Sequence, residues 1–203
     1  MKNRKWWIIG LCTIFILLTV LVKLNLITGF DTFMYEIITF NISDIFTTLY
    51  GVITFLGSTA FIIFLCAFFL IIFTLIKKRN IGLVISAVLI ISTLVNNVLK
   101  LILQRPRPEV LAFVEEHSYS FPSGHTMAAV SMYGILFYII LKSNMNKKIK
   151  IVLNIILTLI PILVAISRVY LGAHFISDVI GAYLVSSILL LIETFYIEKK
   201  NLL

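Results

Sequence analysis

The sequence predicts an all-α integral membrane protein, a six-helix bundle with an amphipathic segment on its outer side. Composition is the first reason, because 61% of the 203 residues are hydrophobic, 13% are charged, and the mean hydropathy is +1.10. A soluble domain is about half apolar and a quarter charged. The second reason is a series of apolar runs, each close to the ~20 residues that a spanning helix needs. The chain length predicts one domain over residues 1–203.

Six apolar runs are candidate spans. They cover residues 6–28, 54–76, 81–103, 125–141, 151–170 and 175–197. The fourth run is short, which indicates an oblique helix or one that begins a few residues earlier. The first run has the basic start of a signal peptide, but no small-residue cleavage pattern follows it, so we expect an uncleaved first helix.

The segment 30–56 alternates apolar and polar residues at loosely helical spacing. This pattern predicts an amphipathic helix lying at the outer interface of the membrane. Such a helix would admit lipid to a site, or it would be a plain connector that covers the helix ends. The sequence leaves both interpretations open.

The net charge of +8 comes from cations that flank the apolar runs. Twelve of the 17 Lys and Arg lie at 2–5, 77–79, 142–150 and 199–200. Cytoplasmic loops of membrane proteins carry such an excess, so we expect both termini in the cytoplasm of a multi-pass cell-membrane protein. No basic face interleaved with aromatic residues is present, which argues against a nucleic-acid partner. The oligomeric state cannot be deduced.

Five cations remain near the other, outer side, where the positive-inside rule disfavours them: Lys23, Lys100, Arg105, Arg107 and Arg168. Four of these five are part of, or adjacent to, three polar clusters at the ends of apolar runs. Cations in that position need a reason, and binding of a phosphate group supplies one.

The first cluster is Lys100 followed by Arg107-Pro108. Pro106 and Pro108 end the third span, because proline lacks an amide proton and disfavours helix in the residue before it. A lysine point charge and an arginine fork both suit phosphate oxygens. The alternative is that Lys100 extends to the interface and Arg107 pairs with lipid phosphates.

The second cluster is Pro122-Ser123-Gly124-His125, directly before the fourth apolar run. Pro and Ser are typical of helix starts. The free amides and the positive dipole end of a helix N-terminus form an anion site, and Gly124 lets the backbone approach a ligand closely. His125 would then donate a proton into that site. An ordinary helix cap with an exposed histidine is the alternative.

The third cluster is Ser167-Arg168 with His174 and Asp178. Gly172 suits the end of the fifth helix, so Arg168 and His174 would flank a tight outer turn. Residues four apart lie on one helix face, and a carboxylate at that spacing fixes the tautomer of a histidine and leaves its other nitrogen as a nucleophile. The alternative is a buried polar pair that holds two helices together.

These three clusters together resemble the type 2 phosphatidic acid phosphatase family, whose pattern is Lys-x6-Arg-Pro, Pro-Ser-Gly-His and Ser-Arg-x5-His-x3-Asp. Lys100 to Pro108, Pro122 to His125, and Ser167 to Asp178 match it without a departure. The family shares its site with vanadium haloperoxidases, and the remaining chain is similar to its small bacterial six-helix members.

The resemblance implies catalytic roles for three residues. His174 would attack phosphorus and form a phosphohistidine, Asp178 would orient His174, and His125 would protonate the leaving oxygen and then help to activate water. It implies phosphoryl-oxygen binding by the following residues: Lys100, Arg107, Pro108, Ser123, Gly124 and Arg168. The two histidines need opposite protonation states, which the sequence cannot assign.

The expected function is hydrolysis of a lipid phosphate monoester or pyrophosphate at the outer leaflet. Candidate substrates are phosphatidylglycerophosphate, undecaprenyl pyrophosphate, phosphatidic acid and diacylglycerol pyrophosphate. The competing hypothesis is a transporter or flippase for an anionic lipid, although transport needs no His-x3-Asp pair and its polar residues belong near mid-bilayer. A haloperoxidase does not suit six apolar runs.

We expect no metal and no cofactor. His125, His174 and Asp178 form a conceivable two-histidine, one-carboxylate set, but three neighbouring cations would repel a divalent ion. Arg105 would bind a second phosphate or the lipid headgroup, or it would be solvated at the interface. Asn96 hydrogen-bonds between helices or orients Lys100. The polar loop residues Glu115, Glu116 and His117 are expected to be solvated.

Overall fold

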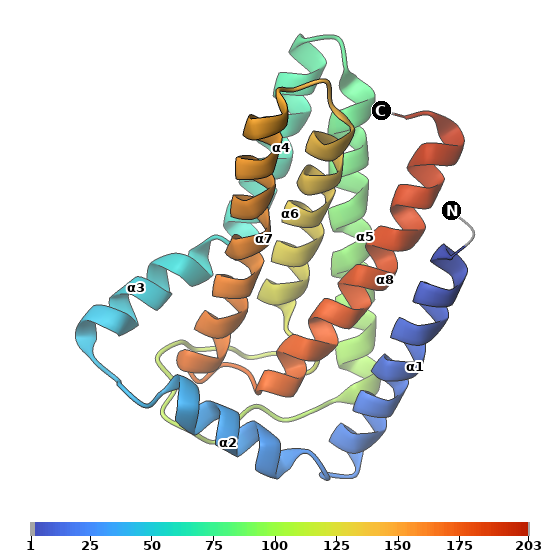
Figure 1. The fold of residues 1–203 in the computed structure, drawn as a ribbon. Coiled ribbons are helices and arrows are strands. Elements are labelled where there is room, and N and C mark those ends of the chain that lie inside the picture. The colour runs from blue at the N-terminus through green and yellow to red at the C-terminus, as the bar shows by residue number, and fades with distance from the viewer. Residues whose placement is uncertain (1–2, 203) are drawn as a thin grey trace.

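The structure, a computed structural model, describes residues 3–202 and contains only helices and connecting segments there. The helices are α1 (Arg4–Lys23), α2 (Thr28–Ile38), α3 (Asp44–Phe55), α4 (Thr59–Leu75), α5 (Arg79–Leu103), α6 (Gly124–Lys142), α7 (Lys147–Tyr170) and α8 (Ile176–Lys200). Figure 1 shows α4 to α8 and α1 as one bundle, with α2 lying across its lower end and α3 splayed outwards.

Helix α6 is central, because it packs on α4, α5, α7 and α8, whereas α1 packs on α8. The largest core cluster joins α5 to α6 through fully buried side chains such as Ile85, Met132 and Ile135. Large apolar side chains are exposed on the outside of the bundle, including Ile14, Phe64 and Leu101. An apolar surface of this extent indicates contact with lipid rather than water.

Among residues 3–202, five helices are long and apolar enough to cross a membrane: α1, α5, α6, α7 and α8. A sixth span is formed if α3 and α4 are taken together, although they are bent by 41° at their junction. The bend follows from Ser58, which caps α4 by accepting a hydrogen bond from the amide of Phe61 at 3.3 Å. The predicted all-helical membrane bundle is therefore confirmed.

Several boundaries differ from the sequence expectation; the second span, for example, begins at Thr59 rather than at residue 54. Two of the differences have a local cause. The first span ends at Lys23 rather than near 28, because Asn25 adopts a left-handed conformation with φ 55°, which asparagine tolerates. The segment 30–56 is not one amphipathic helix. It is divided into α2 and α3, because the hydroxyl of Ser43 accepts from the amide of Phe46 and starts a new helix.

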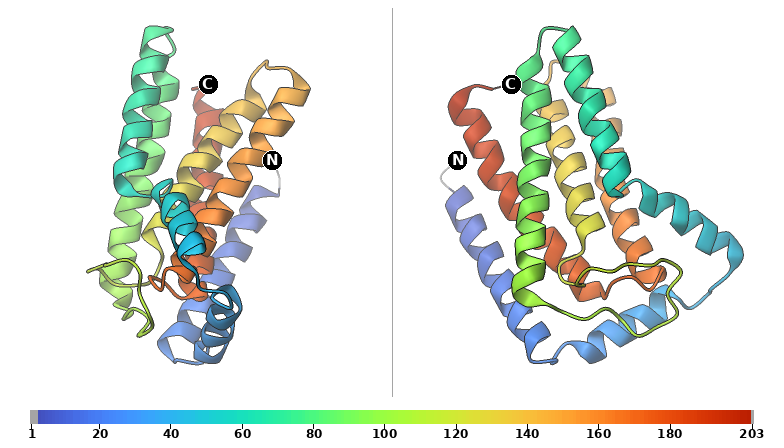
Figure 2. Two further views of the ribbon diagram at one scale, coloured as in Figure 1. Left: turned by 90° about the vertical axis from the view of Figure 1, so that its left-hand side faces the viewer. Right: turned by 180° about the vertical axis from the view of Figure 1, so that it is seen from behind.

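The two ends of the bundle differ in content. Both termini, the α4–α5 turn and the α6–α7 turn lie toward one end (Figures 1 and 2). These segments carry the four basic groups of the sequence. The opposite end holds α2, the long connection between α5 and α6, and the tight turn between α7 and α8. All three polar clusters lie at that second end.

Helices α4 and α5 approach closely at Gly82, where a Cβ atom would lie 2.8 Å from Leu70 Cα. Small residues allow such approaches between membrane helices. We predict that Gly82→Ala lowers the stability of the purified protein in detergent by about 1–3 kcal/mol, because the backbones must separate. Thermal unfolding measures the effect. Gly10→Ala is the matched control, since nothing lies within 4 Å of its Cβ position. Equal midpoints for the two variants would contradict the prediction.

Candidate active site

Five segments meet at the end of the bundle opposite the basic turns. They are the last turn of α5, the 104–123 connection, the first turn of α6, the last turn of α7 and the α7–α8 turn with the start of α8. A cavity of ≈ 190 Å³ lies among them and is lined by Lys100, Glu116, Gly124, His125 and His174, among others. A second cavity of ≈ 700 Å³ adjoins it, sharing Lys100 and adding Arg105 and Arg107.

Lys100 and Arg107 are joined by Ser118. The buried Lys100 donates from Nζ to Ser118 Oγ at 2.9 Å. Arg107 donates from Nε to the Ser118 carbonyl at 2.7 Å and from Nη1 to the Ala173 carbonyl at 2.6 Å. Burial lowers the pKa of Arg107 from its ordinary value, and Glu116 and Asp178 oppose that shift. Pro108 is half-buried, lies beyond the end of α5 at Leu103 and lines neither cavity.

Ser123 caps α6, as its position before the apolar run indicates. Its buried hydroxyl oxygen accepts from the amide and the hydroxyl of Thr126, at 3.5 and 3.0 Å. The Asn96 amide donates to the Pro122 carbonyl at 3.1 Å and holds this segment against α5. A Cβ on Gly124 would lie 3.3 Å from Asn96 Oδ1, so glycine permits close packing here. His125, in the first turn, faces the smaller cavity.

The α7–α8 turn brings Arg168 and His174 together. Gly172 adopts φ +71°, and the amides of Ala173 and His174 both donate to the Arg168 carbonyl, at 3.1 and 3.2 Å. The Arg168 side chain is 2% exposed and donates from Nη1 to Thr54 Oγ1 of α3 at 3.0 Å. Its Nε is buried and has no hydrogen-bond partner among the described residues.

His174 and Asp178 form the predicted contact, with Nδ1 3.3 Å from Oδ2. The carboxylate of Asp178 also accepts from Ser120 Oγ and from the amide of Phe175. Burial lowers the pKa of His174 to about 4, against the opposing effect of Asp178. The imidazole is therefore neutral near pH 7. With the proton on Nδ1 facing Asp178, Nε2 carries a lone pair beside Arg107 Nη1, 3.5 Å away.

Glu116 is not the solvated loop residue that the sequence indicates. Its carboxylate pairs with Arg168 Nη2, lies 3.5 Å from Arg107 Nη2 and is 3.8 Å from His125 Nδ1. Burial raises the pKa of Glu116, but Arg168, His125 and Arg107 outweigh burial and leave the pKa below its ordinary value. A carboxylate thus lies between the cations where an anionic ligand would bind. No periodicity or motif in the 104–123 connection signals this.

Arg105 is held by carboxylates and not by solvent. Nη2 contacts Asp31 Oδ2 at 2.7 Å, and Nη1 contacts Asp178 Oδ1 at 2.6 Å. Because carboxylates occupy both Nη atoms, the guanidinium group of Arg105 is free neither to bind a second phosphate nor to be solvated, as the sequence had indicated. Asn96 bonds to Pro122 rather than to Lys100.

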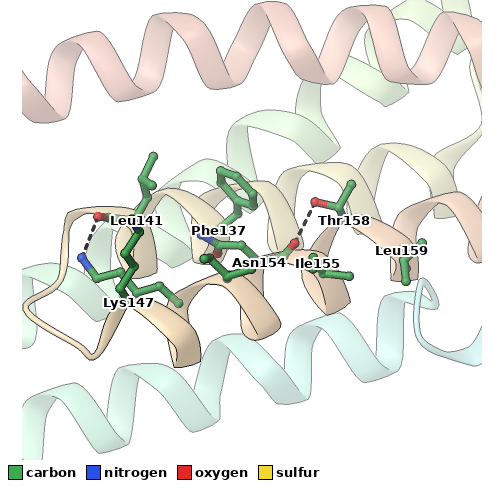
Figure 3. Close-up of a pocket in the computed structure, with 9 residues that line it drawn as sticks. Phe137, Leu141, Lys147, Asn154, Ile155, Thr158 and Leu159 are labelled. Carbon is green, nitrogen blue, oxygen red and sulfur yellow. Dashed lines mark hydrogen bonds between the residues drawn. The ribbon is translucent and has the colours of Figure 1, made fainter.

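A groove away from this end of the bundle has a different lining. One of ≈ 510 Å³ runs between α6 and α7 near the basic turn and is lined largely by apolar residues such as Phe137, Ile155 and Leu159 (Figure 3). Its polar side chains, Lys147, Lys150, Asn154 and Thr158, include no acid and no histidine. Among the described residues, no group of three or more His, Cys, Asp or Glu is placed to hold a metal ion.

Comparisons with known proteins agree on the family and the fold. Residues 81–202 match the PAP2 superfamily model. Over 124 residues the chain is 39% identical to phosphatidylglycerophosphatase B of Bacillus subtilis (strain 168), which covers 61% of each protein. The alignment thus spans about three fifths of that relative's length.

Two crystal structures resemble the whole bundle. A transmembrane PAP2-type phosphatidylglycerolphosphate phosphatase from Bacillus subtilis superposes with a TM-score of 0.88 and 31% identity, over 96% of this chain and 97% of that one. LpxE of Aquifex aeolicus has a TM-score of 0.65 and 24% identity, over 80% and 93% of the two chains, and shares the fold. With the family model covering more than half of its residues, this multi-pass membrane protein belongs to the PAP2 superfamily.

Proposed function

We propose that this protein hydrolyses a phosphate monoester or pyrophosphate of a membrane lipid without a metal. One observation carries the proposal: a neutral histidine paired with a buried carboxylate and a second histidine line the same ≈ 190 Å³ cavity, with three cations around it. Phosphoryl transfer depends mainly on positioning and on stabilising spread negative charge.

His174 is the nucleophile of this mechanism. Its Nε2 attacks phosphorus, the bond from phosphorus to the lipid oxygen breaks, and His125 gives a proton to that oxygen. A water molecule then loses its proton to His125 and attacks the phosphohistidine, which frees inorganic phosphate and restores Nε2. Asp178 accepts the Nδ1 hydrogen throughout and keeps the ring oriented.

The phosphoryl oxygens are bound by the cations and by the start of α6. Lys100, Arg107 and Arg168 supply charge, and the Ser123 hydroxyl and the Gly124 amide donate from the helix end. Arg107 and Arg168 already hold the carboxylate of Glu116. The incoming phosphoryl group therefore takes the place of Glu116 on these guanidinium groups.

A lipid substrate is supported by the second cavity, whose lining includes Leu101 and Tyr119 beside Lys100. The headgroup reaches the cations while the tails stay in the bilayer. Phosphatidylglycerophosphate heads the candidate list because of the relative's name. The others are phosphatidic acid, undecaprenyl pyrophosphate and diacylglycerol pyrophosphate. The basic turns support cytoplasmic termini, which places the site on the outer side of the cell membrane.

The first prediction concerns the two histidines. Purified wild-type protein in detergent releases phosphate from at least one lipid in that panel. His174→Ala abolishes release, because the nucleophile is gone, and His125→Ala lowers kcat by about 10²–10⁴-fold, the usual effect of a general acid. Phosphate assays measure both, with the thermal unfolding midpoint as the check on folding. If the wild type releases no phosphate but moves an anionic lipid across vesicles, the transporter alternative holds.

Chelator provides a second test. We predict that activity persists in excess EDTA, because the phosphoryl group binds directly to Lys100, which lines the cavity, and to Arg107 and Arg168, which contact Glu116 at its edge. Phosphate release with and without EDTA measures this. Complete loss of activity that a divalent metal restores would contradict the mechanism.

A third prediction concerns Glu116. Vanadate mimics the five-coordinate transition state and must displace this carboxylate. Glu116→Gln removes the competing charge, so the vanadate inhibition constant falls by about tenfold, which is about 1.4 kcal/mol. Glu115→Gln is the matched control, since Glu115 is exposed. An inhibition constant that is unchanged or higher in Glu116→Gln would contradict displacement.

A further inference from the structure

Asp31 is a buried acid on α2, outside the segment that matches the family model. Its side chain is 0% exposed. One carboxylate oxygen accepts from the Ser177 amide at 3.0 Å. The other accepts from Ser177 Oγ and from Arg105 Nη2, both at 2.7 Å. An acid that is buried and bonded on both oxygens is part of a specific network.

Arg105 links that acid to the centre of the site. Its Nη1 donates to Asp178 Oδ1 at 2.6 Å and to Ser177 Oγ at 2.7 Å. The guanidinium carbon lies 4.0 Å from the centre of the Phe175 ring, and the side chain is 11% exposed. The planar fork of an arginine can hold two carboxylates at fixed angles, which a lysine cannot do.

Asp178 depends on this link for its charge and direction. One of its oxygens faces Arg105, and the other faces His174, Ser120 and the Phe175 amide. The charged and titratable groups around it are Lys100 from α5, Arg105 and Arg107 from the 104–123 connection, His174 from the turn, and Asp31 from α2 through Arg105. Arg105 is the only cation among these, within the described residues, that forms a direct ion pair with Asp178.

We propose that Arg105 and Asp31 are positioning residues for the reaction, in which Arg105 fixes the carboxylate of Asp178 toward His174 and Asp31 fixes Arg105. This inference rests on the proposed phosphatase function. Arg105 lines the ≈ 700 Å³ cavity, and Asp31 lines neither cavity. Both Nη atoms of Arg105 are held by Ser177, Asp178 and Asp31, so Arg105 acts through Asp178 rather than on the phosphoryl group. Helix α2, which lies across the end of the bundle, thereby becomes part of the catalytic machinery (Figure 1).

The network predicts a separation of kcat from KM. Without Arg105, the carboxylates of Asp31 and Asp178 are left buried without their shared cation, and an unpaired buried charge is costly. Asp178 then takes up a proton or turns, and His174 loses its orientation. The groups that bind the phosphoryl oxygens are untouched. The rate of the chemical step falls, while substrate affinity is retained.

The test uses the full-length protein in detergent with phosphate release from the most active lipid of the panel. The variants are Asp31→Asn, Arg105→Gln, Arg105→Lys and the double variant Asp31→Asn/Arg105→Gln. Asp44→Asn is the matched control, because Asp44 is an exposed acid in the same outer segment. Rates are expressed per vanadate-binding site, which counts only folded protein with an intact anion site.

We expect Asp31→Asn to lower kcat per site by about fivefold or more and Arg105→Gln by about 10–100-fold, with KM within about twofold of wild type. The double variant is no slower than Arg105→Gln, since Asp31 acts through Arg105 and coupled residues are not additive. Arg105→Lys, which keeps the charge but not the fork, falls between wild type and Arg105→Gln. Asp44→Asn keeps the wild-type kcat.

Three results would overturn the inference, and the activity of the wild type shows whether the proposed function fails with it. If Asp31→Asn and Arg105→Gln lower only the unfolding midpoint and keep kcat per site, the network is structural, and the proposed function stands. If KM rises while kcat is kept, Arg105 contacts the substrate instead. If the wild-type protein releases phosphate from no lipid, the proposed function fails and the inference falls with it.

Discussion

The site depends on a balance between positive and negative side chains that are largely shielded from water. Four cations gather at one end of an apolar bundle, brought there by three segments: Lys100 by α5, Arg105 and Arg107 by the 104–123 connection, and Arg168 by α7. Cations in such surroundings must be paired. The chain pairs the three arginines with three carboxylates, those of Asp31, Glu116 and Asp178, whereas Lys100 donates to Ser118. The carboxylates differ in use, because Asp31 and Asp178 are fully buried while Glu116 is partly exposed and borders the cavity.

The sequence was sufficient to predict the membrane spans and to predict that the three clusters meet at one end of the bundle. Hydrophobic runs report membrane helices directly, and helix ends with Pro, Gly and Ser show where the chain turns, so Lys100, His125 and His174 could be assigned to one end of the bundle. The bend between α3 and α4 and the division of the outer segment depended on single serine caps, which a hydropathy pattern does not resolve.

Sequence analysis did not predict which charged side chains contact one another. Glu116 lies in a connection without helical periodicity, and its contacts with Arg168 and Arg107 come from how that connection folds back over the cavity. Asp31 and Arg105 are 74 positions apart. For an acid in a polar loop or on an interfacial segment, the surrounding sequence does not indicate which cation it pairs with. The motif residues could be predicted because, within each cluster, they lie close together in the sequence. The contacts of the supporting charges could not be predicted, because they depend on how separate segments fold together.

The unpartnered Nε of Arg168 has a consequence for how ligand affinity arises. A buried donor without an acceptor costs about 1–3 kcal/mol in the folded state. An oxygen of an incoming phosphoryl group that reaches this atom removes that cost. Part of the binding free energy of such a ligand therefore comes from relief of a desolvation cost. The chain incurs that cost when it folds and buries Arg168 Nε without an acceptor.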